Sequence, residues 1–463
     1  MTASVAGSRL LRKIGEKNAW MKFLKWSSTH LLLAGLILSA SWLRFPNFLF
    51  GCVDYLERAF FSLAGYSRSA HVDPNLRIIY IEERGKDDPW YFGDEEARLK
   101  WRARHAKLVG GLAQAGARII AFDFAFPDPS PFDKEFAGAI RNAGATRVIL
   151  GYEPVPGQPQ PAVSPTLAAV LGPDQISSVK VGGERKDYGG SFYRYIKLSE
   201  SRSIGSATTS SIATFPLQIK LVWESQKKGA PVTALVNEVR SRVVLRAGTE
   251  QFESIPCRIQ RQDDTGGEYK TASLVLNMVE PVELDAISKP YNLVQKWIDE
   301  EPENLVSNYK GRIVLVGVQM EKEKFQVGPD QTPFGYRIHA SVVSNLLQGG
   351  YPRELGIVGQ MTVLFLLCLG AGITRVAVPG GHRPMPIQLF GREWNLPLSL
   401  IFLLGSLVVV TVLIYNHAQI HLDIVYQASA LVAGYYVTGW VLSGSRRSGV
   451  RRDSGKHRKE GAS

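Results

Sequence analysis

The hydrophobic pattern of the 463-residue chain contains four stretches that are apolar over about 20 residues, the length of helix that crosses about 30 Å of hydrocarbon. Trp26 and Trp42 flank the first stretch, and Trp394, Tyr415 and Trp440 lie near ends of the others, as aromatic residues do at membrane interfaces. We expect transmembrane helices at 27–45, 355–376, 396–415 and 423–443.

The first apolar stretch has a second interpretation. Ser39, Ala40 and Ser41 are small residues of the kind that a signal-peptide cleavage site uses, so a cleaved signal peptide is the alternative to a membrane anchor. Bulky or charged residues follow at 42–44, and they favour the anchor.

The region between the first and second apolar stretches alternates between apolar β-branched runs and segments with helical spacing. Strands are expected at 76–83, 118–126, 147–154 and 311–318. Helices are expected at 95–115, 132–143, 292–306 and 338–348. Near-continuous Ile and Val runs joined by helices are typical of a parallel sheet covered on both faces. Between about 155 and 285 the pattern weakens into Pro-rich and Gly-rich stretches with short strands, which predicts a β-rich antiparallel insertion or sheet edge.

The charge distribution predicts the orientation in the membrane. Three segments, 1–27, 375–395 and 444–463, carry net charges of +5, +2 and +5, which together equal the +12 of the whole chain. Positively charged flanks stay on the cytoplasmic side during insertion, so both termini and the 375–395 segment are expected inside. The same distribution argues against a nucleic-acid partner, because the basic excess belongs to membrane flanks.

These patterns together predict one division of the chain. It comprises a basic cytoplasmic segment (1–26), a membrane helix (27–45), an extracytoplasmic domain (46–354), a second helix (355–376), a cytoplasmic loop (377–395), a third helix (396–415), an outer loop (416–422), a fourth helix (423–443) and a basic cytoplasmic tail (444–463). Cys52 and Cys257 would face the same compartment, so a disulfide between them and two free thiols both stay open.

Carboxylates follow two of the expected parallel strands. Ligands of such folds lie beyond the carboxyl ends of the strands, so Glu82, Glu83, Asp123 and Asp128 are candidate ligand-binding residues. Of these, Glu82, Asp123 and Asp128 could supply oxygen ligands to Ca²⁺ or Mg²⁺. The alternative is structural, because Asp128 and Asp133 can form turns and cap the helix that follows.

The sequence contains none of the common catalytic signatures. There is no Ser-His-Asp spacing, no nucleophile elbow, no phosphate-binding glycine loop followed by Lys-Ser/Thr and no His-Glu-x-x-His. We therefore expect a protein that is not an enzyme, with no catalytic residues and no cofactor.

Several segments, in a fixed order, resemble a known family. They are Trp101 with Arg104-His105, AQAGARIIAFDFAFPDPSPFDKEFAGAI, ISKPYNLV, KGRIVLVGV and RIHASVVSNLLQGG. This order resembles the second type of the CHASE extracellular sensor domain of bacterial signalling proteins, over roughly 50–352. The resemblance implies an α/β sensor domain with one helix before it and three after it, and it adds Arg104, His105 and His339 to the candidate ligand-binding residues.

The sequence departs from the family pattern at two places. The family's paired aspartates are replaced by Glu82-Glu83, and its Trp-Pro pair before the Arg is absent. The twenty residues after the last apolar stretch are rich in Arg, Lys, Ser and Gly, a composition that cannot form an output domain and is suited to anionic lipid. The resemblance is thus to a stand-alone form.

The sequence therefore predicts a multi-pass sensor of the bacterial inner membrane. Its extracytoplasmic domain would detect a small molecule or an envelope signal, and its helices would relay the change to a separate cytoplasmic or membrane effector. A homo-oligomer is one expected arrangement. The alternative is a structural or assembly subunit that uses the outward domain as a protein-contact module.

Overall fold

The computed structural model describes most of the chain between residues 27 and 440. The described residues are 27–37, 70–153, 163–181, 184–185, 192–193, 195–204, 207–208, 212–237, 241–264, 267–325, 327, 332–350, 353–355, 357–378, 384–389, 392–418, 420–421 and 426–440. The chain forms two compact units. One, the α/β unit, is Phe61–Glu354, and the other, the helical unit, is Met1–Phe60 with Leu355–Ser463.

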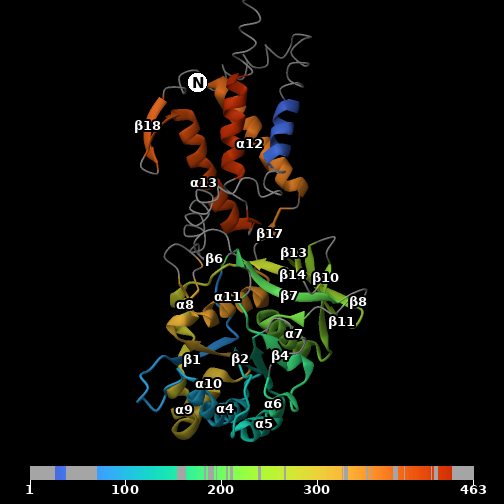
Figure 1. The fold of residues 1–463 in the computed structure, drawn as a ribbon, viewed down its shortest axis with the longest axis vertical. Helices are drawn as coiled ribbons and strands as arrows, with labels where there is room; N and C mark the ends of the chain where they lie inside the picture. The colour runs from blue at the N-terminus through green and yellow to red at the C-terminus, as the bar shows by residue number, and fades with distance from the viewer. Residues whose placement is uncertain are drawn as a thin grey trace, which may run out of the picture. The chain divides into compact units, whose positions relative to one another are not determined.

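The α/β unit is built on a six-stranded sheet in the order β15-β1-β16-β2-β3-β4, and all neighbouring strands are parallel. Figure 1 labels β1, β2 and β4 of this sheet. Its strands are β1 (Leu76–Glu82), β2 (Ile119–Ala125), β3 (Arg147–Tyr152), β4 (Ile176–Ser178), β15 (Ser288–Pro290) and β16 (Ile313–Gln319). The four strands expected from apolar runs are confirmed as β1, β2, β3 and β16. The two short edge strands, β4 and β15, were not expected.

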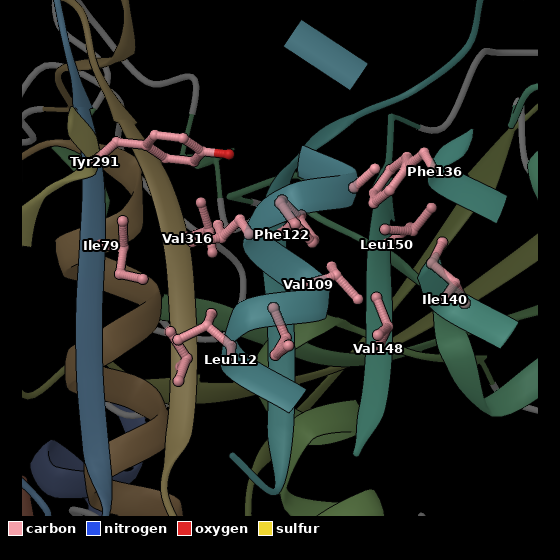
Figure 2. Close-up of a cluster of buried hydrophobic side chains, with 14 of the residues drawn as sticks. Ile79, Val109, Leu112, Phe122, Phe136, Ile140, Val148, Leu150, Tyr291 and Val316 are labelled. Carbon is pink, nitrogen blue, oxygen red and sulfur yellow. The ribbon is translucent and has the colours of Figure 1, made fainter. Parts of the chain in front are cut away.

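Side chains alternate along each strand, so both faces of the sheet carry apolar residues. Ile79, Phe122, Leu150 and Val316 face one core, which is covered by α4 (Glu95–Gln114), α5 (Asp133–Arg141), α6 (Pro165–Ala168), α9 (Tyr291–Glu300) and α10 (Pro302–Tyr309). Figure 2 shows these side chains meeting Val109 and Leu112 of α4 and Phe136 and Ile140 of α5. Ile78, Ile119, Ile149 and Leu315 face a second core under α7 (Phe215–Lys228), α8 (Pro281–Ala286) and α11 (Gly335–Gln348).

Two expected helices have different bounds in the structure. The single helix expected at 292–306 is two helices, α9 and α10, because Glu301 leaves the helical conformation at φ −138° and Pro302 begins the second helix. Proline lacks an N–H and disfavours helix in the residue before it, so the break follows from the sequence. The helix expected at 338–348 begins three residues earlier, at Gly335.

The region with the weak pattern forms the β-rich part of the unit, as expected. Antiparallel sheets run in the orders β10-β11-β12 and β13-β14-β7-β8, with β9 beside β7. The strands are β7 (Tyr195–Ile204), β8 (Ala207–Thr208), β9 (Ile212–Ala213), β10 (Val232–Asn237), β11 (Arg242–Ala247), β12 (Glu250–Pro256), β13 (Arg258–Asp264) and β14 (Gly267–Val275). They pack on α7 and α11 through a third core, in which Leu217 and Ile338 meet Val243, Ile255 and Leu274.

Short elements complete the described chain. They are β5 (Glu184–Arg185), β6 (Phe192–Tyr193), η2 (Pro173–Gln175), η3 (Glu321–Glu323), β17 (Arg353–Glu354), β18 (Pro384–Leu389), β19 (Arg392–Pro397) and β20 (Ile420–His421). β18 and β19 pair as an antiparallel hairpin that covers most of the expected cytoplasmic loop (377–395) and the first two residues of the expected third helix.

The helical unit has a helix in each of the four places where an apolar stretch predicts one. They are Ser27–Ile37, α12 (Ile357–Ala377), α13 (Leu398–Ala418) and 426–440. Residues 38–45 of the first predicted span lie outside the described residues. Among the described residues, one helix, Val358–Ala377, is long and apolar enough to cross a membrane, and Ser27–Ile37 and Leu398–Ile414 are apolar but shorter. A topology with four spans therefore stays a prediction.

Polar contacts join these helices to one another. The buried His30 Nε2 lies 3.0 Å from Thr438 Oγ1, and the hydroxyls of Ser399 and Tyr435 are 2.8 Å apart. Polar side chains of apolar helices commonly bond across helix interfaces in this way. A Cβ at Gly434 would lie 2.5 Å from the carbonyl oxygen of Cys368, so the glycine lets the last helix approach the α12 backbone closely.

Gly317 of β16 lies close against Tyr336 of α11. A Cβ there would lie 2.2 Å from Cβ of Tyr336, a distance that no real pair of Cβ atoms adopts. We expect Gly317→Ala to push α11 off the sheet and to reduce the free energy of unfolding by about 1–3 kcal/mol, the usual cost of overpacking.

The matched control is Gly138→Ala in α5, where a Cβ would meet nothing within 4 Å. It should be neutral or should stabilise by roughly 0.5–1 kcal/mol, because alanine favours helix. Thermal and urea unfolding of the purified protein measure both variants. Equal effects of the two substitutions would contradict the close contact.

Candidate functional site

Asp123 lies in an irregularity of β2 near the carboxyl edge of the sheet. Phe122 pairs with Leu150 of β3, but the next pair is Ala125 with Gly151, so two residues of β2, Asp123 and Phe124, are extra in this ladder. Bulges of this kind redirect side chains and are frequent beside functional sites.

Gly151 is the residue that accommodates the bulge. A Cβ on Gly151 would lie 2.6 Å from the carbonyl oxygen of Phe124 and 2.9 Å from that of Phe122. A glycine inside a strand often marks such a close approach of backbone, and here it allows the extra residues of β2 to turn toward β3.

The bulge places Asp123 opposite His339 of α11. Asp123 Oδ1 and His339 Nδ1 are 2.7 Å apart, and the two side chains are only 4% and 2% exposed. Burial raises the pKa of the Asp123 carboxyl, and the neighbouring His339 opposes that rise. A buried carboxylate needs a partner, so the bond fixes the face that α11 presents to the sheet.

Sequence reasoning did not select two further carboxylates, Glu323, which interacts electrostatically with Asp123, and Glu153, which interacts with Glu323. Burial raises the pKa of Glu323 in η3, and the negative charges of Asp123 and Glu153 add to the rise. Glu153 directly follows β3, and Glu323 follows β16 by a few residues. The signal that selected Asp123, a carboxylate after a parallel strand, was therefore present for both.

Asp128 belongs to a structural loop. The buried Arg102 of α4 donates to the Asp128 carbonyl oxygen at 2.9 Å and to Asp133 Oδ1 at 2.5 Å. Ser130 N and Ser164 Oγ donate to the other oxygen of Asp133. The Pro-rich loop before α5 is thus held by a buried ion pair, which favours the structural interpretation of Asp128 and Asp133.

His105 is buried in an aromatic cluster. Its Nδ1 lies 3.0 Å from the hydroxyl of Tyr291, and the rings of Phe122, Phe124, Phe126 and Phe136 lie 5.2–5.9 Å from its ring. Burial lowers the pKa of His105 well below its ordinary value, with Arg102 and Arg104 adding to the effect. A neutral imidazole in this setting packs the core and is out of reach of a ligand.

Glu82 and Glu83 lie at the carboxyl end of β1, and Arg104 of α4 contacts the loop that follows this strand. Arg104 stacks over Trp90 at 4.3 Å and donates to the carbonyl oxygen of Pro89. Glu82 Oε2 accepts from Arg84 at 2.6 Å, and Glu83 Oε2 accepts from the backbone N–H of Glu321 at 3.0 Å. A small hollow opens here, with room for about one water molecule. It is lined by Ile81, Glu82, Arg84, Trp90, Trp101, Tyr291 and Asn292.

The structure separates the predicted site residues into groups. Asp123 and His339 form one pair. Glu82 lines the Trp90 hollow, Arg104 stacks on Trp90, and Asp128 lies on the loop that Arg102 contacts. Among the residues that the structure describes, no three His, Cys, Asp or Glu side chains gather in a way that could hold a metal ion. The predicted metal set of Glu82, Asp123 and Asp128 is therefore not brought together, because Asp123 bonds to His339 and Glu82 bonds to Arg84.

A family model for the CHASE2 domain matches residues 31–374, which is most of the chain and includes the whole α/β unit. The chain belongs to the CHASE2 domain family. CHASE2 domains are extracellular sensor domains, so the protein is membrane-associated and its α/β unit lies outside the cytoplasm. No curated protein and no solved structure matches the chain.

The raised pKa of Asp123 predicts how the free energy of unfolding depends on pH. Below the ordinary pKa of 3.8 the Asp123 carboxyl is protonated in both the folded and the unfolded chain. Because its pKa is raised in the folded state, the wild type loses stability relative to Asp123→Asn as the pH rises through the folded pKa. We expect the difference in unfolding free energy, variant minus wild type, to grow from acidic to neutral pH.

Urea denaturation of both proteins at a series of pH values gives this difference directly. The control is Glu96→Gln, which removes a carboxylate that is 78% exposed on α4. A pH-independent difference for Asp123→Asn would mean that the carboxyl is not desolvated.

Proposed function

We propose that this CHASE2 protein is a bacterial inner-membrane sensor that relays an extracytoplasmic signal to a separate effector. The signal acts on the α/β unit at the carboxyl edge of its sheet. The relay passes through α11 to the membrane helices, and the effector is a cytoplasmic or membrane protein.

The observation that carries this proposal is the buried bond between Asp123 and His339. It joins the carboxyl edge of the sheet, where parallel folds bind ligands, to α11. α11 is the last long helix of the α/β unit, and residues 349–356 alone separate it from α12, the helix that is long and apolar enough to span a membrane. A change at the edge that moves Asp123 therefore acts on the element that leads to the membrane.

The geometry of the pair supports sensing over catalysis. An Asp bonded to His Nδ1 can orient a histidine for base catalysis, but both side chains here are almost completely buried. A substrate would have to reach an imidazole that is 2% exposed. The proposed protein accordingly turns over no substrate and needs no cofactor.

The charge distribution supports a topology of four spans with both termini in the cytoplasm. We expect Lys228→Cys, at the end of α7, to react with a membrane-impermeant maleimide in intact cells with a permeable outer envelope. Arg447→Cys should react only after the inner membrane is opened. The native cysteines Cys52, Cys257 and Cys368 are replaced by serine or alanine beforehand. Labelling of both positions from the same side would contradict the topology.

The relay is tested by partner capture from native membranes. We expect an effector that co-purifies with the wild type to change in amount by about fivefold or more with His339→Gln, since coupling free energies between sites are typically of that size. The amount of membrane-inserted sensor is held equal between samples.

The matched control is His71→Gln. His71 also bonds a carboxylate, Glu283, at 2.8 Å, but it is 63% exposed and precedes β1, so it lies before the end of the strand that is opposite the carboxyl edge. It should leave capture unchanged. Equal capture by wild type and His339→Gln would contradict the relay, and capture of envelope structural proteins in place of a signalling protein would favour an assembly subunit.

A further inference from the structure

The loop between β1 and α4 closes over the Trp90 hollow, and Arg84 holds it there. Arg84 bonds Glu82 at 2.6 Å and Asp88 at 3.2 Å, so one guanidinium connects the strand end to the loop. The loop is also tied to α4, because Trp101 Nε1 donates to the carbonyl oxygen of Tyr91 at 2.8 Å. The hollow thus has a wall of strand and helix on one side and a loop on the other.

Three aromatic rings form the apolar part of the hollow. The ring centroids of Trp90 and Trp101 are 5.9 Å apart, those of Trp90 and Tyr291 are 6.4 Å apart, and those of Trp101 and Tyr291 are 4.9 Å apart. The rings are inclined to one another at 55–69°. Trp101 and Tyr291 are each only 2% exposed, and the guanidinium of Arg104 lies over the rings of Trp90 and Trp101, so a solute reaches these rings only when the loop and Arg104 move. Rings in such an arrangement bind alkyl groups and organic ammonium ions.

The polar part of the hollow carries one charge of each sign. Glu82 and Arg84 are 38% and 29% exposed, so both can be reached by a solute, and at present they neutralise each other. Asn292 adds an amide that can donate and accept. A solute with a net charge would be attracted by one of these two charged side chains and repelled by the other.

We propose that the Trp90 hollow binds a small zwitterion that carries an ammonium group and a carboxylate a few bonds apart, as amino acids and betaines do. The ammonium takes the place of Arg84 beside Glu82, and the carboxylate takes the place of Glu82 beside Arg84. The three rings contact the alkyl groups. This inference rests on the proposed sensor function, for which it names the site and the class of signal.

Binding requires the ion pair to open, because the hollow now has room for about one water molecule. Ion pairs exposed to this degree contribute little to stability, so separating Arg84 from Glu82 is not costly. Arg84 also bonds Asp88, and therefore its movement displaces the loop. Glu83, next to Glu82, accepts from the backbone N–H of Glu321 in η3, and η3 also contains Glu323, which interacts electrostatically with Asp123.

The test titrates the purified full-length protein in detergent and follows tryptophan fluorescence. Glycine betaine and L-alanine are the zwitterionic probes, with a methylated and a primary ammonium. Choline, acetate and glycerol are the cationic, anionic and uncharged comparisons. Fluorescence is preferred to thermal shift, because osmolytes of this kind stabilise proteins without binding a site. We expect a saturable change with at least one zwitterion at millimolar or lower concentration, at least tenfold tighter than with choline or acetate.

Variants assign the binding to the hollow. Glu82→Gln and Arg84→Gln should each lower the affinity for the zwitterion at least tenfold. Trp90→Phe should remove most of the fluorescence change. Glu96→Gln should bind as the wild type does, because Glu96 likewise pairs with a basic side chain, Lys100 at 2.6 Å, but lies outside the hollow.

The outcomes separate this inference from the sensor function. No saturation by either zwitterion, binding by Glu82→Gln or Arg84→Gln that is as tight as binding by the wild type, or tighter binding of choline than of both zwitterions would each overturn the site. None of these results depends on an effector. Zwitterion binding together with unchanged effector capture in His339→Gln would leave the site standing and overturn the relay.

Discussion

Burial of both faces of the parallel sheet is the constraint from which the rest of the α/β unit follows. Helices cover each face, so the interior positions of β1, β2, β3 and β16 are apolar and close-packed. Polar groups can enter only at the strand ends or with a partner. The carboxyl edge consequently holds Asp123 with His339. Arg102 pairs with Asp133 between α4 and α5, and Glu82 at the end of β1 pairs with Arg84.

The parts of the fold that the sequence predicts are those with a local cause. Continuous Ile and Val runs predicted the four inner strands, and the charged flanks and apolar stretches predicted where the helices of the helical unit lie. The edge strands β4 and β15 were missed because they are three residues long and have the sequences Ile-Ser-Ser and Ser-Lys-Pro, which carry no apolar run. The break between α9 and α10 at Glu301 had a local signal, Pro302. It was missed because the helical spacing of apolar residues continues across the proline.

The candidate site was only partly predictable, because its pairings join distant segments. Asp123 was recognisable as a carboxylate near the end of a strand, but its partner His339 is 216 residues away and entered through family resemblance. Arg102 and Asp133 are 31 residues apart and were not paired in advance. His105 was selected together with its neighbour Arg104. On α4 the His105 side chain points into the aromatic core, while Arg104 stacks on Trp90.

The bulge in β2 has a consequence for how the length of this segment can vary. The ladder between β2 and β3 gains two residues, an even number, so the alternation of side chains is preserved across it. Phe122, Phe124 and Phe126 therefore all face the aromatic cluster around His105, while Asp123 faces α11. Inserting or deleting a single residue here would send the carboxylate into the aromatic cluster and a phenylalanine toward His339. Across the family, natural length changes within this segment should therefore come in twos.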